Sequence, residues 1–252
     1  MEKKRAFYYL AITFLITWGC WWTLAFLTQY AGVTADRWLY KGLHMLGGFG
    51  PTIAAILVLP KRTPKEILRF VFGCRKKSLW VLLLYCALQV LIFGLSAREV
   101  RPDLPWFAIP FVFLSVTIIG GGNEELGWRG ILQPALERKM AFPFATLLTG
   151  GVWMLWHVPL WFVEGTSQQS MPFLRYVLFG LILSVWLATT YRRTKSVFYC
   201  CLLHGFSNLM LSLFVVKVNW ILVVGLLLSL VVSYFLLRGT EASQAEQCSP
   251  NE

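Results

Sequence analysis

The chain has 252 residues, of which 57% are hydrophobic and 14% are charged, and its mean hydropathy is +0.62. This composition excludes an ordinary soluble domain and predicts a polytopic membrane protein. The net charge of +11 would suggest a nucleic-acid partner in a soluble protein, but most Lys and Arg residues lie in alternate loops between apolar segments, so we expect a lipid bilayer and no nucleic acid.

Apolar segments of transmembrane length follow one another along almost the whole chain. A helix needs about 20 apolar residues to cross the hydrocarbon core of a bilayer. Eight segments approach or reach this length, at approximately residues 7–30, 43–59, 79–96, 107–136, 142–163, 173–191, 197–216 and 220–237. The expected fold class is therefore all-α, a polytopic membrane protein with about eight transmembrane helices.

The basic residues indicate which loops face the cytoplasm. They gather before the first segment, in the second, fourth and sixth connections, and after the last segment. Loops rich in Lys and Arg normally stay on the cytoplasmic side, so both the N-terminus and the C-terminus are predicted to be cytoplasmic. The sequence shows no internal repeat, and we expect one integral-membrane domain over residues 1–240 and a short polar cytoplasmic tail over residues 241–252.

Two local features of the first half of the chain have structural consequences. The dipeptide Gly50-Pro51 lies inside the second apolar segment and should bend its helix. Residues 61–77 interleave basic and apolar side chains. This pattern predicts a basic amphipathic helix on the inner leaflet of the membrane.

Two adjacent carboxylates and an arginine follow the strongly apolar run 111–119. Ionisable groups are costly to insert at such a position and usually indicate function. In a helix, Glu125 and Arg129 are four residues apart and share one face, whereas Glu124 points about 100° away. We therefore expect Arg129 to pair with Glu125 and to leave Glu124 free to act as a base.

Further polar groups stand inside two later apolar segments: His157 in one, and His204 with Asn208 in the other. His204 and Asn208 are four residues apart and share a helix face. Taken singly, each group has a structural explanation, such as a buried histidine or an interhelical amide contact. Together with the carboxylates, they form a set that could activate a water molecule and stabilise an oxyanion.

The helical rise gives a partial test of whether these groups can meet inside the membrane. At about 1.5 Å per residue, Glu124 and Asn208 lie roughly 20 Å, and His204 roughly 14 Å, from the nearest cytoplasmic basic residue. His157 comes out deeper, at roughly 27 Å, unless residues 141–144 precede the span. The sequence leaves the depth of His157 open.

Three short motifs on successive apolar segments carry a family resemblance. They are Glu124-Glu125-xxx-Arg129, Trp153-xxx-His157 and His204-xxx-Asn208. In this order they resemble the motifs of the CPBP family, which includes the type II CAAX prenyl endopeptidases and bacterial abortive-infection-type proteins. The resemblance covers about residues 109–208. The aromatic residue of the second motif is usually Phe, and we interpret Trp153 as a bulky apolar replacement that leaves the role of the histidine intact.

The resemblance implies an intramembrane endopeptidase of a bacterial cell membrane. Its substrate would be a membrane-anchored or lipidated protein, such as a prenylated CAAX-type protein, or a peptide such as a bacteriocin. The implied roles are activation of a water by Glu124 and His157, stabilisation of the tetrahedral oxyanion by His204 and Asn208, and support of the site by Glu125 and Arg129. Burial also makes an unpaired glutamate a better base, which agrees with this division.

Alternatives remain open for both the mechanism and the function. Some family members have been described as metalloproteases, and Glu124, His157 and His204 could supply the three protein ligands of a catalytic zinc. The resemblance favours a metal-free glutamate mechanism without a cofactor. Two other function classes are a non-catalytic immunity or scaffold membrane protein, and a proton-coupled transporter in which the buried Glu and His residues would form a relay.

Overall fold

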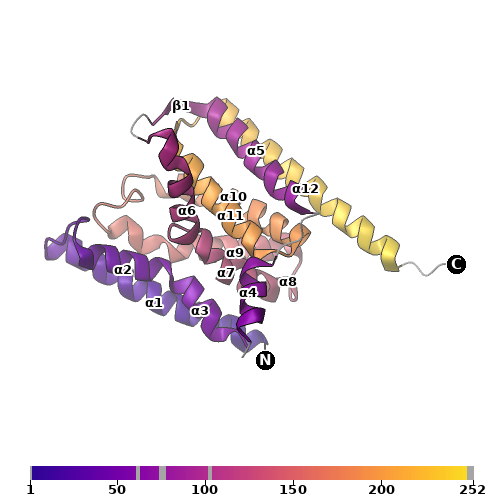
Figure 1. The fold of residues 1–252 in the computed structure, drawn as a ribbon, viewed down its shortest axis with the longest axis horizontal. Coiled ribbons are helices and arrows are strands. Elements are labelled where there is room, and N and C mark those ends of the chain that lie inside the picture. Colours follow the sequence, from indigo (N-terminus) through magenta and orange to yellow (C-terminus); the bar gives the residue numbers. More distant parts are fainter. Residues whose placement is uncertain (1, 61–62, 74–77, 102–103, 249–252) are drawn as a thin grey trace.

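The computed structural model describes residues 2–60, 63–73, 78–101 and 104–248, and these are almost entirely helical (Figure 1). The α-helices are α1 (Glu2–Tyr30), α2 (Trp38–Gly48), α3 (Gly50–Val58), α4 (Pro64–Phe72), α5 (Leu79–Ser96), α6 (Ile109–Ile118), α7 (Glu125–Gly127), α8 (Gln133–Glu137), α9 (Phe142–Trp156), α10 (Phe173–Thr194), α11 (Val197–Leu213) and α12 (Trp220–Cys248). The remaining elements are the 3₁₀ turns η2 (Trp106–Ala108), η3 (Gly122–Glu124) and η5 (Val158–Phe162), the π-helical turn η4 (Trp128–Leu132), and the strands β1 (Ala97–Val100) and β2 (Phe214–Val216). The expected all-α class is confirmed.

Several described helices are long and apolar enough to cross a membrane. These five candidate spans are Lys4–Tyr30, Leu79–Ser96, Trp106–Glu137, Phe173–Thr194 and Trp220–Arg238, and the bent pair of α2 and α3 makes a sixth. They confirm a polytopic membrane protein, but the predicted number of eight is not confirmed. Two predicted spans form helices of only 15 residues (α9) and 17 residues (α11), which are shorter than the roughly 20 residues of a full crossing.

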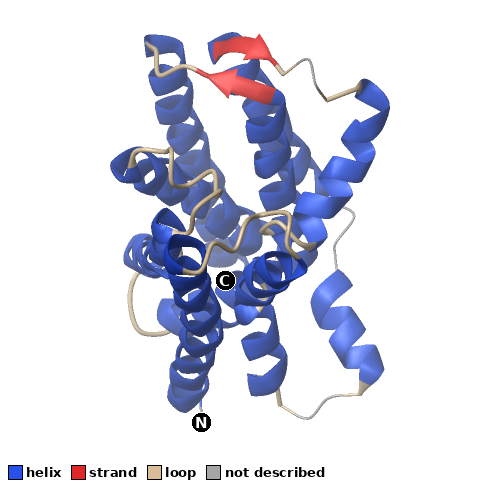
Figure 2. Cartoon of the chain, turned by 90° about the vertical axis from the view of Figure 1, so that its left-hand side faces the viewer, coloured by secondary structure: helices blue, strands red, loops and turns tan. Residues whose placement is uncertain are grey.

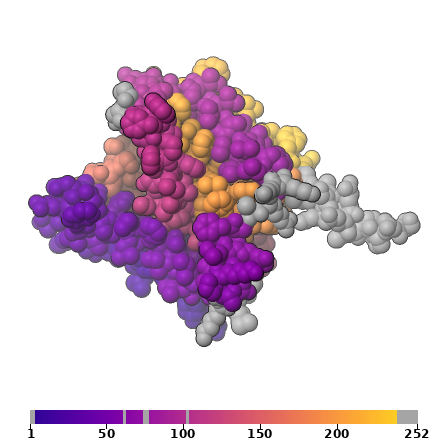
Figure 3. All heavy atoms as spheres, viewed as in Figure 1, coloured from indigo at the N-terminus to yellow at the C-terminus, as the bar shows by residue number. Residues whose placement is uncertain are grey.

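The helices form a bundle with the N-terminal elements on one flank. Figure 1 shows α1, α2 and α3 along one side and α5 with α12 along the other, with α7, α9, α10 and α11 between them. In the space-filling view of Figure 3, the indigo N-terminal helices form the lower left of the molecule and later helices form the upper part. The motif-bearing elements α7, α9 and α11 therefore lie in the middle of the bundle.

The break between α2 and α3 confirms the bend predicted at Gly50-Pro51. The two helices are inclined by 45°. Pro51 lies in the first turn of α3, where a helix does not need its missing N–H. Gly50 also lies directly against α1, because a Cβ atom on it would come 2.2 Å from Oγ1 of Thr17. The bent pair thus packs closely against α1 at a position that requires a glycine.

Contacts between connections support the predicted alternation of sides. Oγ of Ser196, before α11, donates to the carbonyl of Gly73, before α5, over 2.7 Å. At the other end of these helices, β1 and β2 pair in antiparallel fashion, with Ala97 opposite Val216 (Figure 2). The strands were not expected, because their residues lie at the ends of apolar segments. They hold together two connections that were both predicted to be extracytoplasmic.

Helix α4 occupies the centre of the predicted basic amphipathic segment. Thr63 and Glu66 form a capping box at its start. None of its residues is buried, but its last residue, Phe72, packs edge to face against Phe198 of α11 with ring centroids 5.6 Å apart. The remaining basic residues of the predicted segment lie outside the described residues: Lys61, Arg62, Arg75, Lys76 and Lys77.

The core next to the motif-bearing elements is rich in aromatic rings. Trp128 of η4 and Trp156 of α9 are fully buried, and their ring centroids lie 5.9 Å apart. Tyr9 of α1, which is also fully buried, lies edge to face against Trp128 at 5.6 Å. Such edge-to-face pairs add stability beyond the burial of their area. The N-terminal helix, the carboxylate motif and α9 therefore share one packed cluster.

Candidate active site

The backbone departs from regular α-helix just before the two adjacent carboxylates. Helix α6 ends at Ile118, and Gly121 then adopts a φ of +129°, which favours glycine. The motif follows as η3, α7 and η4 instead of continuing the helix of α6. The candidate span Trp106–Glu137 thus contains an irregular stretch at residues 119–121, and Glu124 lies shortly after it.

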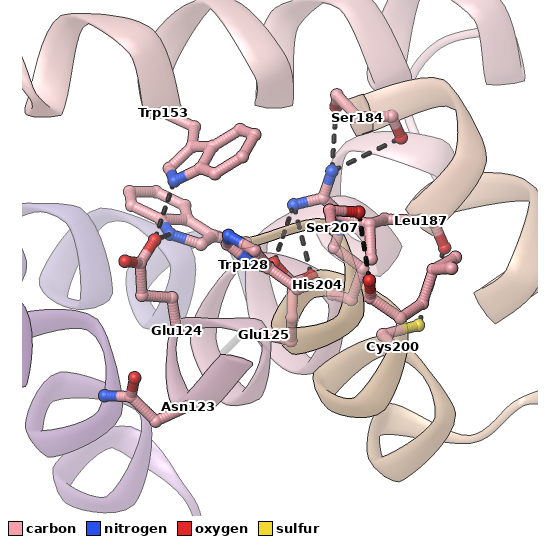
Figure 4. Close-up of polar contacts among 12 residues, drawn as sticks. Asn123, Glu124, Glu125, Trp128, Trp153, Ser184, Leu187, Cys200, His204 and Ser207 are labelled. Carbon is pink, nitrogen blue, oxygen red and sulfur yellow. Dashed lines mark hydrogen bonds and ion pairs between the residues drawn. The ribbon is translucent and has the colours of Figure 1, made fainter. Parts of the chain in front are cut away.

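The carboxylate of Glu124 is held on one side by two indole groups (Figure 4). Nε1 of Trp153 donates to Oε2 of Glu124 over 2.7 Å, and Nε1 of Trp128 lies 3.4 Å from the same oxygen. The glutamate is only 6% exposed. Within the described part of the chain, no group donates to its other oxygen, Oε1. A nearly buried carboxylate therefore keeps one oxygen available to a water molecule.

The predicted pair of Glu125 and Arg129 is present. Nη1 of Arg129 lies 3.2 Å from Oε2 of Glu125, and both side chains are fully buried. Nη2 of Arg129 also donates to Oγ of Ser184 on α10 over 2.8 Å. Arg129 belongs to the π-helical turn η4, a distortion that is frequent at functional sites. The guanidinium is thus fixed between its own helical segment and α10.

His204 of α11 lies beside the same carboxylate. Its Nδ1 is 2.8 Å from Oε1 of Glu125. An ionised carboxylate only accepts hydrogen bonds, so Nδ1 is the donor and Nε2 is the nitrogen left for a ligand. Glu125 therefore links Arg129 of its own segment to a histidine of another helix.

Asn208 follows His204 by one helical turn and faces the same place, as the spacing predicts. Its Nδ2 donates to the carbonyl of Gly120. A Cβ atom on Gly121 would come 2.7 Å from Nδ2 of Asn208 and 2.8 Å from Nε2 of His204. Two polar nitrogens thus converge on a glycine, and any larger residue would displace them.

His157 lies directly after the last residue of α9 and is 6% exposed. Its Nδ1 lies 2.9 Å from the backbone oxygen of Trp153. A carbonyl oxygen only accepts, so Nδ1 donates and Nε2 carries the lone pair of the neutral ring. The rings of Trp156 and Tyr176 pack edge-on against the imidazole, with centroids 4.5 and 5.3 Å away. The hydrogen bond to the backbone of Trp153 sets the orientation of the ring.

The indole of Trp153 joins the groups that the sequence placed on three different segments. Its centroid lies 5.5 Å from the ring of His157 and 5.1 Å from the ring of His204. The greater depth calculated for His157 therefore does not separate it from the other candidate residues. The structure brings all six together, namely Glu124, Glu125, Arg129, His157, His204 and Asn208.

Four contributions to this site were not expected from the sequence. Trp153 was expected to act only as a bulky apolar side chain, but its indole N–H donates to Glu124. A buried indole usually finds a hydrogen-bond acceptor, so the tryptophan itself was a signal of this contact. The orientation of His157 uses the backbone carbonyl of residue 153, so it does not depend on which side chain stands there. The glycine run that includes Gly121 was a visible sign of an unusual backbone. Ser184 gave no signal.

The residues considered as zinc ligands are not arranged as a metal site. In the portion of the chain that the structure describes, no group of three or more His, Cys, Asp or Glu side chains could hold a metal ion. His157 uses Nδ1 for a backbone carbonyl and Glu124 receives an indole N–H on Oε2, and these contacts leave Nε2 of His157 and Oε1 of Glu124 open. The described residues therefore show no preformed cluster of three ligands for zinc.

Comparisons with known proteins agree with the motifs. Residues 105–210 match the family described as type II CAAX prenyl endopeptidase Rce1-like. The chain is also 26% identical to CAAX prenyl protease 2 of Methanococcus maripaludis over 231 residues, which cover 80% of this chain and 82% of the relative. The resemblance predicted from the motifs is thus confirmed, and the segment that holds every candidate site residue is similar to the Rce1-like type II CAAX prenyl endopeptidases.

Proposed function

We propose that this integral membrane protein is an intramembrane endopeptidase, and that Glu124 is its general base. The observation that carries the proposal is the different bonding of two adjacent glutamates. Glu125 forms an ion pair with Arg129 and a hydrogen bond with His204. Glu124, in contrast, has one carboxylate oxygen, Oε1, that forms no hydrogen bond with any described residue. The similarity to CAAX-type endopeptidases supports a peptidase over a transporter or a scaffold.

The first step is the activation of a water molecule by Glu124 and His157. Oε1 of Glu124 accepts a proton from the water as its oxygen attacks the carbonyl carbon of the scissile peptide bond. Nε2 of His157 accepts a hydrogen bond from the same water, because Nδ1 is committed to the backbone of Trp153. General base catalysis by a positioned side chain typically contributes about 10²–10⁴ in rate.

The negative charge that develops on the carbonyl oxygen is stabilised by His204 and Asn208. Nε2 of His204 and Nδ2 of Asn208 converge on Gly121, and the second N–H of the Asn208 amide is not needed by Gly120. The Glu125 carboxylate holds Nδ1 of His204 and leaves Nε2 for the oxyanion; in the proposed step the ring donates from Nε2 as an imidazolium, with a proton on both nitrogens. Glu125 and Arg129 therefore act by holding His204.

Collapse of the tetrahedral intermediate completes the reaction. The carbon–nitrogen bond breaks, and the proton held by Glu124 moves to the leaving amine. The products are a new carboxyl terminus and a free amino group, and Glu124 returns to its ionised form. No step requires a metal ion or a cofactor.

The proposed substrate is a membrane-anchored or lipidated protein, with a prenylated C-terminus as the first choice. CAAX prenyl protease 2, the similar relative, carries this substrate class in its name. A lipid chain would hold such a substrate in the bilayer that surrounds the candidate spans. The alternative substrate is a membrane-bound peptide without a prenyl group.

The test uses the purified full chain in proteoliposomes. Two peptides with the same CAAX C-terminus, one farnesylated and one not, are incubated with the wild type and with Glu124→Gln, and the released tripeptide is measured by mass spectrometry. We expect the wild type to cleave the farnesylated peptide and the variant to be inactive at an unchanged unfolding temperature. Cleavage by Glu124→Gln would exclude Glu124 as the base, and equal cleavage of both peptides would exclude recognition of the prenyl group.

A further inference from the structure

Trp153 makes the shortest contact to the carboxylate that we propose as the base. Its Nε1 lies 2.7 Å from Oε2 of Glu124, and the indole is 3% exposed. The second indole, that of Trp128, lies at 3.4 Å from the same oxygen and makes a weaker contact. A hydrogen bond to an ionised group is about twice as strong as one between neutral groups. The position of Oε2 is therefore determined mainly by Trp153.

The same indole also contacts Arg129, His157 and His204. The guanidinium carbon of Arg129 lies 5.6 Å from the centroid of the Trp153 ring, within the range of a cation–π contact. The imidazole rings of His157 and His204 make T-shaped contacts with it, with ring centroids 5.5 and 5.1 Å away. These contacts leave Trp153 little room to rotate. Its N–H consequently has a fixed direction, and it points at Glu124 (Figure 4).

We propose that Trp153 is a positioning residue that sets the rotation of the Glu124 carboxylate. The terminal torsion of a glutamate is broad and nearly two-fold, so an unrestrained carboxylate would sample many orientations. With Oε2 bound to the indole N–H, Oε1 is the oxygen directed at the water. A Phe at residue 153 would fill a similar space but could not donate. This role rests on the proposed function of Glu124 and adds a specific requirement for the indole nitrogen.

The chain offers a matched control for this proposal in Trp156, one turn further along. Trp156 is fully buried and packs against His157, as Trp153 does, but its Nε1 has no hydrogen-bond partner among the described residues. Trp153→Phe and Trp156→Phe therefore remove the same atoms from neighbouring buried positions. Only the first removes a hydrogen bond to Glu124.

The test measures kcat and KM of both variants on the peptide that the wild type cleaves. Loss of a hydrogen bond to a charged group typically lowers an equilibrium constant or a rate constant by about 10-fold to 100-fold. We expect Trp153→Phe to lower kcat by this factor with little change in KM, and Trp156→Phe to stay within about 3-fold of the wild type. Equal kcat values in the two variants would overturn the proposal. Failure of the wild type to cleave any peptide would instead contradict the proposed function.

A second measurement tests the hydrogen bond without turnover. Nitrogen-15 labelling of tryptophan gives one indole N–H signal for each ring, and Trp153→Phe and Trp156→Phe assign the two of interest. In Glu124→Gln, we expect the Trp153 signal to move upfield because its acceptor is no longer ionised, and the Trp156 signal to stay in place. A Trp153 signal that does not respond to Glu124→Gln would overturn the proposed contact even if the wild type proves to be an active protease.

Discussion

Nδ1 of His204 lies 2.8 Å from Oε1 of Glu125, which joins two residues that are 79 positions apart in the chain. Glu125 also pairs with Arg129, so one carboxylate holds a cation of its own segment and a histidine of α11. The two adjacent glutamates therefore have different partners. This difference is the structural basis for assigning catalysis to Glu124 and support of the site to Glu125.

The buried pair of Glu125 and Arg129 should be strongly coupled in stability. Arg129→Met removes the cation paired with Glu125 and leaves only His204 beside this buried carboxylate; breaking a buried pair by removing one partner typically costs about 3–5 kcal/mol. We expect a clearly lower unfolding temperature in detergent for this variant and for Glu125→Gln. The double variant should lose much less than the sum of the two. Additive losses would contradict a direct interaction between the two side chains.

Gly121 should be required for the geometry of the oxyanion site. Gly121→Ala introduces a Cβ atom that would come within 2.8 Å of Nε2 of His204, at a φ of +129° that L-residues rarely adopt. We expect a loss of about 1–3 kcal/mol in stability and a larger loss of activity. Gly151→Ala is the matched control, because a Cβ atom there meets nothing within 4 Å. Equal peptidase activities of the two variants would contradict the close approach.

Asn208 should contribute to the transition state and little to binding of the substrate. Removing one oxyanion donor typically lowers kcat by about 10²–10³. We expect Asn208→Ala to lower kcat by this factor, with KM within a few fold of the wild type. The measurement is steady-state cleavage in proteoliposomes. A rise in KM with kcat unchanged would assign Asn208 to substrate binding.

Activity should survive the removal of metal ions. The described His, Cys, Asp and Glu side chains form no group that could hold a metal, and the proposed steps use only Glu124, His157, His204 and Asn208. We expect full activity after exhaustive dialysis against a chelator. Elemental analysis of the dialysed sample provides the control. Activity that is lost with the metal and restored by zinc would contradict the glutamate mechanism.

Much of the fold follows from local sequence patterns. Apolar length predicts the candidate spans, Gly50-Pro51 predicts the 45° bend, and the basic loops predict which connections lie together. The turn at Gly121 is harder to predict, because a glycine in an apolar run also occurs in unbroken helices. The pairing of β1 with β2 depends on how α5 and α11 pack, and no local pattern records that packing.

The site shows the same division between local and long-range contacts. The pair of Glu125 and Arg129 follows from helical periodicity alone, because both residues lie on one face of one segment. The contact between Trp153 and Glu124 spans 29 positions and depends on the rotation of α9 about its axis. An apolar segment with polar residues at single positions does not specify that rotation. The grouping of the candidate residues was therefore predictable, whereas the donors that orient them were not.

The most direct test of the central claim compares cells that produce the wild type with cells that produce Glu124→Ala at matched levels. Membrane peptides and protein C-termini are measured by mass spectrometry in both. The account predicts cleavage products that occur only with the wild type, and their sequences would identify the substrate. Identical profiles, with both proteins folded in the membrane, would contradict an endopeptidase and favour a scaffold or a transporter.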